Sequence, residues 1–148
     1  MEKQFYYEDV EVGMELPTMT KQPTSRQLVM YCGASEDFTE YHYDKDAALR
    51  RGLPNVIVQG ALTRAFLVQL ITDWIGEEGT FKKFKTANRK PFFIQEKIIC
   101  KGTVAKKHVE GHDHYLECDV WAEKSNGDKC VVATALVTLP VRATGTKS

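Results

Sequence analysis

The segment from residue 62 to residue 74 constrains the fold more than any other part of the chain. Apolar side chains recur there at every fourth position, at Leu62, Phe66, Leu70 and Trp74, with Leu67 and Ile71 beside them. This spacing predicts a central, largely buried helix that ends at Gly76 or Gly79. The stretch 56–75 also contains the charged and amide side chains of Gln59, Arg64, Gln69 and Asp73. A core helix, and not a membrane span, is therefore expected.

The segments around this helix read mainly as strands. A short extended strand is expected over 14–20, and further strands over 81–87, 93–104, 115–123 and 131–139. Residues 116–122 alternate cleanly between apolar and polar, which is typical of a strand with one buried face. Asn126-Gly127 predicts a hairpin with a type I′ turn between the last two strands. A second helix is expected after a Thr24 cap. This order gives an α+β fold in which an antiparallel sheet is covered by the long helix.

The length and net charge of the chain limit the classes of protein to which it can belong. A chain of 148 residues predicts a single domain over 1–148. Its 20 Lys and Arg residues balance 20 Asp and Glu residues, so nucleic acid is not an expected partner. Residues 1–4 are not followed by an apolar stretch, and the four cysteines form no Cys-x-x-Cys pair. We therefore expect a cytoplasmic protein with reduced, buried thiols.

The polar loop 31–46 contains Asp37 and, five residues later, His42. A carboxyl group and an imidazole in one loop can hold a water molecule between them. A neutral imidazole accepts a proton near pH 7. A carboxyl group in a partly apolar cleft can have a raised pKa and act as an acid. The spacing alone is more typical of a solvated surface loop.

Residues 58–61, Val-Gln-Gly-Ala, mark the start of the long helix. Free N–H groups at a helix start carry a partial positive charge. Gly60 allows a ligand to approach the backbone closely. The segment could therefore form an oxyanion site, although taken alone a small residue at this position is more typical of close helix–sheet packing.

Together, these segments resemble the hydratase motif of a known family. Residues 31–44, then Ala48, Gly52 and residues 58–61, are similar to that motif in MaoC-like (R)-specific enoyl-CoA hydratases and 3-hydroxyacyl dehydratases. The opening residues 7–14 also look like the start of these proteins. The resemblance covers nearly the whole chain and implies a single hot-dog domain.

The resemblance also implies a site and a reaction. Asp37, His42 and Gly60 would be catalytic, and Thr39, Gln59 and Ala61 would contact substrate. Water held by Asp37 and His42 would add to C3 of an enoyl thioester, with the Gly60 N–H on the thioester oxygen. His42 would accept a proton, and Asp37 would help to deliver one to C2. No cofactor or metal is implied, and the domain would pair as a homodimer or heterodimer.

The chain departs from the family pattern at several positions. Glu36 replaces a glycine, Thr39-Glu40 replaces Asn-Pro, Gln59 replaces a histidine, and Val68 stands where relatives carry a hydroxyl. Two alternatives follow: a hot-dog thioesterase, or a non-catalytic acyl-thioester-binding subunit of a heteromeric dehydratase.

Two further segments carry side chains that could bind a ligand. The basic stretch 82–90 is either a solvated face or a contact for the phosphates of coenzyme A or of a carrier-protein phosphopantetheine. His112 and His114 suggest a metal site, but a solvated hairpin end explains them better, because no further ligands accompany them.

Overall fold

The computed structural model describes residues 3–144. The elements in chain order are η1 (Tyr7–Asp9), β1 (Met19–Lys21), α1 (Ser25–Ser35), η2 (Glu40–His42), α2 (Lys45–Arg50), α3 (Gly60–Ile75), β2 (Thr80–Asn88), β3 (Ile98–Glu110), β4 (Asp113–Glu123) and β5 (Lys129–Thr138). The five strands form one antiparallel sheet in the order β1-β3-β4-β5-β2. The predicted α+β architecture is confirmed.

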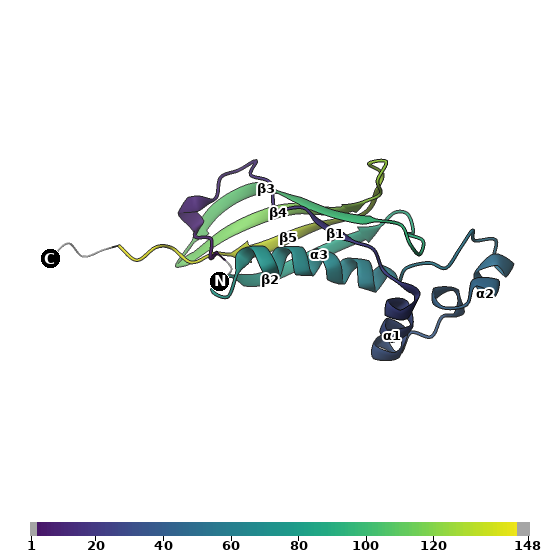
Figure 1. Ribbon diagram of the computed structural model, residues 1–148. Coiled ribbons are helices and arrows are strands. Elements are labelled where there is room, and N and C mark those ends of the chain that lie inside the picture. Colours follow the sequence, from purple (N-terminus) through teal and green to yellow (C-terminus); the bar gives the residue numbers. More distant parts are fainter. Residues whose placement is uncertain (1–2, 145–148) are drawn as a thin grey trace.

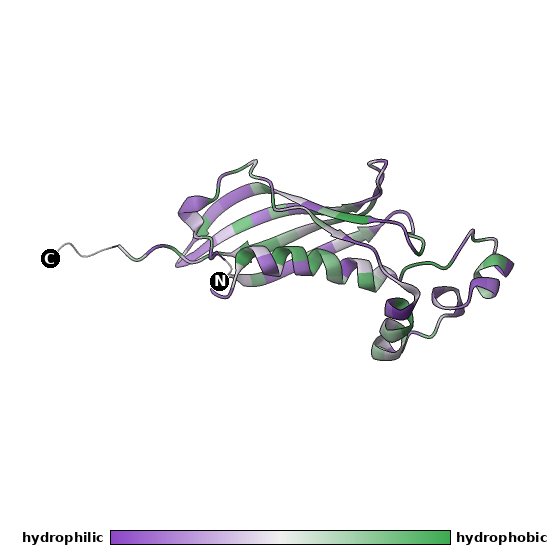
Figure 2. Ribbon diagram, viewed as in Figure 1, coloured by the Kyte–Doolittle hydropathy of each residue, from purple (hydrophilic) through white to green (hydrophobic). Residues whose placement is uncertain are grey.

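Helix α3 lies along one face of the curved sheet (Figure 1). Its apolar positions, Leu62, Phe66, Leu70 and Trp74 among them, are buried as predicted. They belong to one core with the inward-facing residues of the strands, which include Leu116, Cys118, Val120 and Ala122. Figure 2 shows apolar residues along α3 and alternating with polar ones on the strands. The opposite side of α3 carries exposed Ala65, Gln69, Thr72 and Asp73. Burial of the apolar stripe holds the helix, and therefore its first residue Gly60, at a fixed place on the sheet.

Three local predictions differ from the structure. The strand expected over 14–20 is present only as β1, Met19–Lys21. The expected strand 93–104 begins only at Ile98. Gln95 has a φ of 71°, and the Phe93 N–H donates to the Glu96 carboxylate at 2.8 Å, so residues 93–96 turn and cannot continue a strand. The β4–β5 hairpin is present, but only Gly127 of the Asn126-Gly127 pair has a positive φ. The turn is therefore not type I′.

The four cysteines are free and buried, as predicted. Burial raises the pKa of the Cys100 and Cys118 thiols to about 12, which keeps them as protonated, unreactive core residues. Within residues 3–144, no helix is long and apolar enough to cross a membrane.

Candidate active site

The residues between β1 and α3 form an overhang that projects beyond one end of the sheet (Figure 1). The overhang consists of α1, η2, α2 and the segments that join them. Local capping builds it: the Thr24 hydroxyl accepts from the Gln27 N–H at the start of α1, as predicted. The Asp44 carboxylate accepts from the Ala47 N–H at the start of α2. These caps fix where α1 and α2 begin, on either side of the segment that carries Asp37 and His42.

His42 ends the short helix η2 and is buried. Its Nδ1 lies 2.6 Å from the Ile57 carbonyl oxygen. A carbonyl oxygen can only accept a hydrogen bond, so Nδ1 carries the proton in the neutral ring. Nε2 therefore presents a lone pair, and it lies 3.8 Å from Asp37 Oδ2. The two predicted acid–base residues are thus brought together.

Asp37 lies on the exposed side of this pair, with its side chain 47% accessible. Its Oδ1 accepts from the Thr39 hydroxyl at 2.6 Å and from the Thr39 N–H at 3.2 Å. These two hydrogen bonds hold the pKa of the Asp37 carboxyl below its ordinary value. The expectation of a raised pKa is therefore wrong for the free chain, because the carboxylate is solvated and hydrogen-bonded.

A cavity of about 350 Å³ opens beside His42. His42 and Tyr41 from the overhang, Gly60 and Thr63 from α3, and Asn88 at the end of β2 all contribute to its wall. Gly60 is the first residue of α3, and within the described residues its N-cap Gln59 makes no side-chain hydrogen bond to the helix start. The first turn of α3, whose N–H groups have no partner within the helix, therefore lies at a cavity that His42 also lines.

The other predicted contact residues lie differently. Gln59 is 1% exposed, and its Nε2 donates to the Leu28 carbonyl oxygen at 2.9 Å and lies 3.2 Å from Cys32 Sγ. Its side chain thus packs α3 against α1 and is turned away from the cavity. Ala61 is half-buried beside Gly60, and Thr39 is engaged with Asp37.

Several residues on the cavity wall were not predicted. Thr63 is buried, and its hydroxyl reaches only the Gln59 carbonyl, at 3.5 Å. Asn88 is exposed at the end of β2, next to Arg89 and Lys90, which also line the cavity. Asn88 lies inside the basic stretch 82–90, but nothing in the sequence sets Asn88 or Thr63 apart from ordinary strand and core residues.

The arrangement suits a bridging water molecule. A separation of 3.8 Å between His42 Nε2 and Asp37 Oδ2 is too long for a direct hydrogen bond. A water molecule at hydrogen-bond distance from both atoms can donate one proton to each. The oxygen lone pairs of that water are then left free to attack an electrophile in the cavity.

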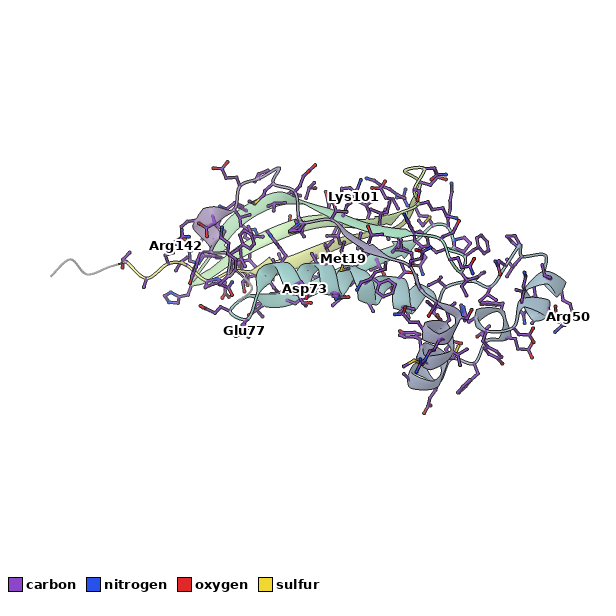
Figure 3. The ribbon with its side chains drawn as sticks, viewed as in Figure 1. Met19, Arg50, Asp73, Glu77, Lys101 and Arg142 are labelled. Atoms are coloured by element: carbon purple, nitrogen blue, oxygen red, sulfur yellow. The ribbon has the colours of Figure 1, made fainter. Side chains whose placement is uncertain are left out.

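Two other candidate chemistries, a thioesterase that would use Asp73 and a metal site, find less support. Asp73, the carboxylate on the long helix, lies thirteen residues beyond Gly60, about 20 Å along the helix axis. Figure 3 shows it on α3, far from the overhang where Arg50 marks α2. Within residues 3–144, no group of three or more His, Cys, Asp or Glu side chains is arranged to hold a metal ion. His112 lies in the turn between β3 and β4, and His114 packs edge-on against Tyr7.

Comparison with known proteins identifies related chains. The family model described as "MaoC like domain" matches residues 9–115. A curated relative is the 3-oxo-4,17-pregnadiene-20-carboxyl-CoA hydratase beta subunit of Mycobacterium tuberculosis. It is 27% identical over 132 residues, which cover 88% of this chain and 96% of the relative.

Solved structures share the fold. The unliganded R-hydratase PhaJ1 from Pseudomonas aeruginosa aligns with a TM-score of 0.85 at 18% identity, covering 94% of this chain and 88% of that chain. A chain of the ChsH1-ChsH2 complex from Mycobacterium tuberculosis aligns with a TM-score of 0.76 at 22% identity. The alignment covers 87% of this chain and 98% of that chain. The predicted hot-dog fold is confirmed by these likenesses.

Proposed function

Because the chain belongs to the MaoC-like domain family, we propose that it adds water reversibly to trans-2-enoyl thioesters, giving (3R)-3-hydroxyacyl thioesters. One observation carries the proposal: the free Nε2 of His42 faces Asp37 and shares a cavity with the start of α3. This addition requires an acid–base pair opposite an oxyanion site.

In the proposed reaction, the water held between Asp37 and His42 attacks C3 of the enoyl group. Its oxygen forms the new C3–O bond, and His42 Nε2 accepts one of its protons. The Asp37 carboxylate stabilises the imidazolium that results. The pair then returns one proton to C2, so a single water molecule is added and both side chains regain their starting forms. Dehydration runs through the same steps in reverse.

The electrons displaced from the C2–C3 double bond move onto the thioester oxygen. We place that oxygen at the Gly60 N–H, where the helix start supplies a hydrogen bond and a partial positive charge. The enolate collapses when C2 takes up its proton. Removing one donor from such a site costs about 10²–10³-fold in kcat in known cases. Because the steps need only side chains and backbone N–H groups, we propose that no metal or organic cofactor takes part.

Arg89 and Lys90 lie on the cavity wall. The Lys90 ammonium is paired with the Asp128 carboxylate at 3.2 Å, so Arg89 supplies the positive charge for a phosphate-bearing carrier. The substrate class is therefore a thioester of coenzyme A or of a phosphopantetheine carrier. We also propose that the chain works in a dimer of hot-dog domains. The curated relative is named as a beta subunit, and one structural neighbour is a complex of two different chains, so a second, different chain is a candidate partner.

The direct test is to mix the purified chain with trans-2-enoyl-CoA esters and follow the loss of the conjugated enoyl absorbance. The panel should contain short, long and ring-bearing acyl groups, and the product should be resolved into its 3R and 3S forms. Activity that yields the 3R product and survives EDTA supports the proposal.

Two outcomes would replace it with an alternative. Release of free thiol from saturated acyl-CoA, with enoyl absorbance unchanged, would identify a thioesterase. Saturable binding of the ester without turnover would identify a binding subunit, and addition of the cognate second chain would then decide whether activity appears in the complex.

A further inference from the structure

We propose that the side-chain amide of Asn88 is a second N–H donor to the thioester oxygen, beside the backbone N–H of Gly60. This inference rests on the proposed function, because it assigns Asn88 a contact with the substrate at the same site. Asn88 lies 28 positions after Gly60 in the chain, and the fold brings the two together: one begins α3 and the other ends β2.

The distance between the two groups suits a shared acceptor. Asn88 Nδ2 lies 3.0 Å from the point that a Cβ atom on Gly60 would occupy. That point is about 2.5 Å from the Gly60 nitrogen by standard covalent geometry. The two donor nitrogens are therefore at most about 5.5 Å apart. One oxygen can accept from both, because N–H···O hydrogen bonds are about 2.9 Å long.

The backbone around Asn88 is held in place. Asn88 pairs with Val131 of β5, and Val131 lines the same cavity. The next two N–H groups, of Arg89 and Lys90, both donate to the Cys130 carbonyl, at 2.8 and 3.2 Å. The sheet thus fixes the backbone from which the Asn88 amide extends, so only its side-chain torsions have to be set for it to donate to a substrate oxygen.

The amide is also free to serve a ligand. Among the side-chain hydrogen bonds of residues 3–144, none involves Asn88. The Arg64 guanidinium lies 3.7 Å from the same point beside Gly60, which makes the surroundings favourable to negative charge. An amide donates without titrating, so its contribution would not change with pH.

The experiment compares Asn88→Ala and Asn88→Asp with the unchanged protein. Asn88→Ala removes the donor, and Asn88→Asp keeps the shape but replaces the donor with a carboxylate that repels the enolate oxygen. Thr86→Ala is the matched control, because Thr86 is exposed two residues earlier on the same strand. The readouts are kcat and KM on a short enoyl-CoA, and the infrared C=O band of bound, carbonyl-labelled butyryl-CoA.

We expect kcat to fall about 10²-fold in Asn88→Ala and further in Asn88→Asp, while Thr86→Ala stays at the level of the unchanged protein. The C=O band of bound butyryl-CoA should lie at lower frequency in the unchanged protein than in either Asn88 variant. A kcat within twofold in Asn88→Ala, or an Asn88→Asp variant that is more active than Asn88→Ala, would overturn the inference.

Butyryl-CoA has no double bond to hydrate, so the infrared comparison does not depend on hydratase activity. An unchanged protein that binds butyryl-CoA but never hydrates enoyl-CoA would contradict the proposed function alone. A C=O band at the same frequency in the unchanged protein and in Asn88→Ala would contradict the role of Asn88 alone.

Discussion

At the scale of single residues, the proton on His42 is placed by a main-chain carbonyl. The contact of 2.6 Å between Nδ1 and the Ile57 oxygen fixes which nitrogen is protonated. The Ile57 N–H in turn donates to the Tyr41 carbonyl at 3.0 Å, so the two segments hold each other. Asp37 is therefore not needed to orient the His42 ring, and its carboxylate can face the bridging water.

Thr39 lowers the pKa of Asp37 through two hydrogen bonds, and substitution of Thr39 should show this effect. In Thr39→Val the hydroxyl donor is lost while the backbone N–H remains, so the pKa of Asp37 should rise toward its ordinary value. The charged form of Asp37 is favoured in the folded chain above that pKa, and the advantage disappears as the pH falls through it. A ¹³C NMR titration of the carboxyl groups measures the midpoint, with Thr72→Val as the control. An unchanged midpoint in Thr39→Val would show that the hydroxyl is not the cause.

The residues of the site differ in whether a short stretch of sequence is enough to predict them. Asp37, His42 and Gly60 were predicted because they lie in two short motifs that can be read from consecutive residues. Thr63 and Asn88 were not predicted, because their place on the cavity wall depends on how α3 and β2 meet. Gln59 was expected at the substrate, but a buried amide so close to α1 satisfies its donor there.

At the scale of elements, α1 ends in a conformation that its sequence does not favour. Glu36 follows the helix with a φ of 58°, in the left-handed region that glycine adopts most easily. The MaoC-like motif that residues 31–44 resemble has a glycine at this position. The backbone turn that leads into Asp37 is thus formed here by a residue other than glycine.

Replacing Glu36 with glycine should therefore stabilise the chain. We expect Glu36→Gly to raise the free energy of unfolding by about 1 kcal/mol, since a left-handed residue other than glycine costs about 1–2 kcal/mol. Urea denaturation measures the change. Glu11→Gly is the control, because Glu11 is also exposed and does not have a positive φ. It should lower stability slightly. A loss of stability in Glu36→Gly would mean that the left-handed turn is not strained.

Elements with a strong repeat were predicted well, and elements set by single backbone contacts were not. The period of four in α3 and the period of two in β4 follow directly from burial on one face. Phe93 and Ile94 are as apolar as a strand would require, yet the chain turns at Gln95 and leaves both side chains half-buried, with one isolated bridge from Phe93 to Ile57 and no continuous strand pairing. Periodicity cannot distinguish these two ways of burying the same residues.

At the scale of the whole molecule, β2 is the long free edge of the described sheet. It spans nine residues, whereas the opposite edge, β1, spans three. Lys82, Lys83 and Lys85 lie on it, and it contains no carboxylate. Antiparallel pairing of two copies about Phe84 would set Lys83 opposite Lys85 of the second copy, and like charges in that position repel.

A homodimer formed through β2 should therefore be strengthened by salt, because salt screens this repulsion. Lys83→Glu would make the edge complementary to itself and should tighten the dimer at low salt. Sedimentation at low and high ionic strength measures both effects, with Lys45→Glu on α2 as a control for the change in net charge. A dimer that weakens with salt in the unchanged protein would place the interface elsewhere.

The most direct test of the whole account is the rate of enoyl-CoA hydration in His42→Ala and Asp37→Asn, measured beside the unchanged protein. Asp37→Asn should keep the unfolding midpoint, because its side chain is exposed. His42→Ala should lower the midpoint, because a buried ring and its hydrogen bond to the Ile57 carbonyl are lost, so both rates are measured at a temperature at which circular dichroism shows each variant to be folded. Each should lose about 10²–10⁴-fold in kcat, the usual contribution of a positioned acid–base group. Full activity in both folded variants would contradict the claim that this pair holds the attacking water.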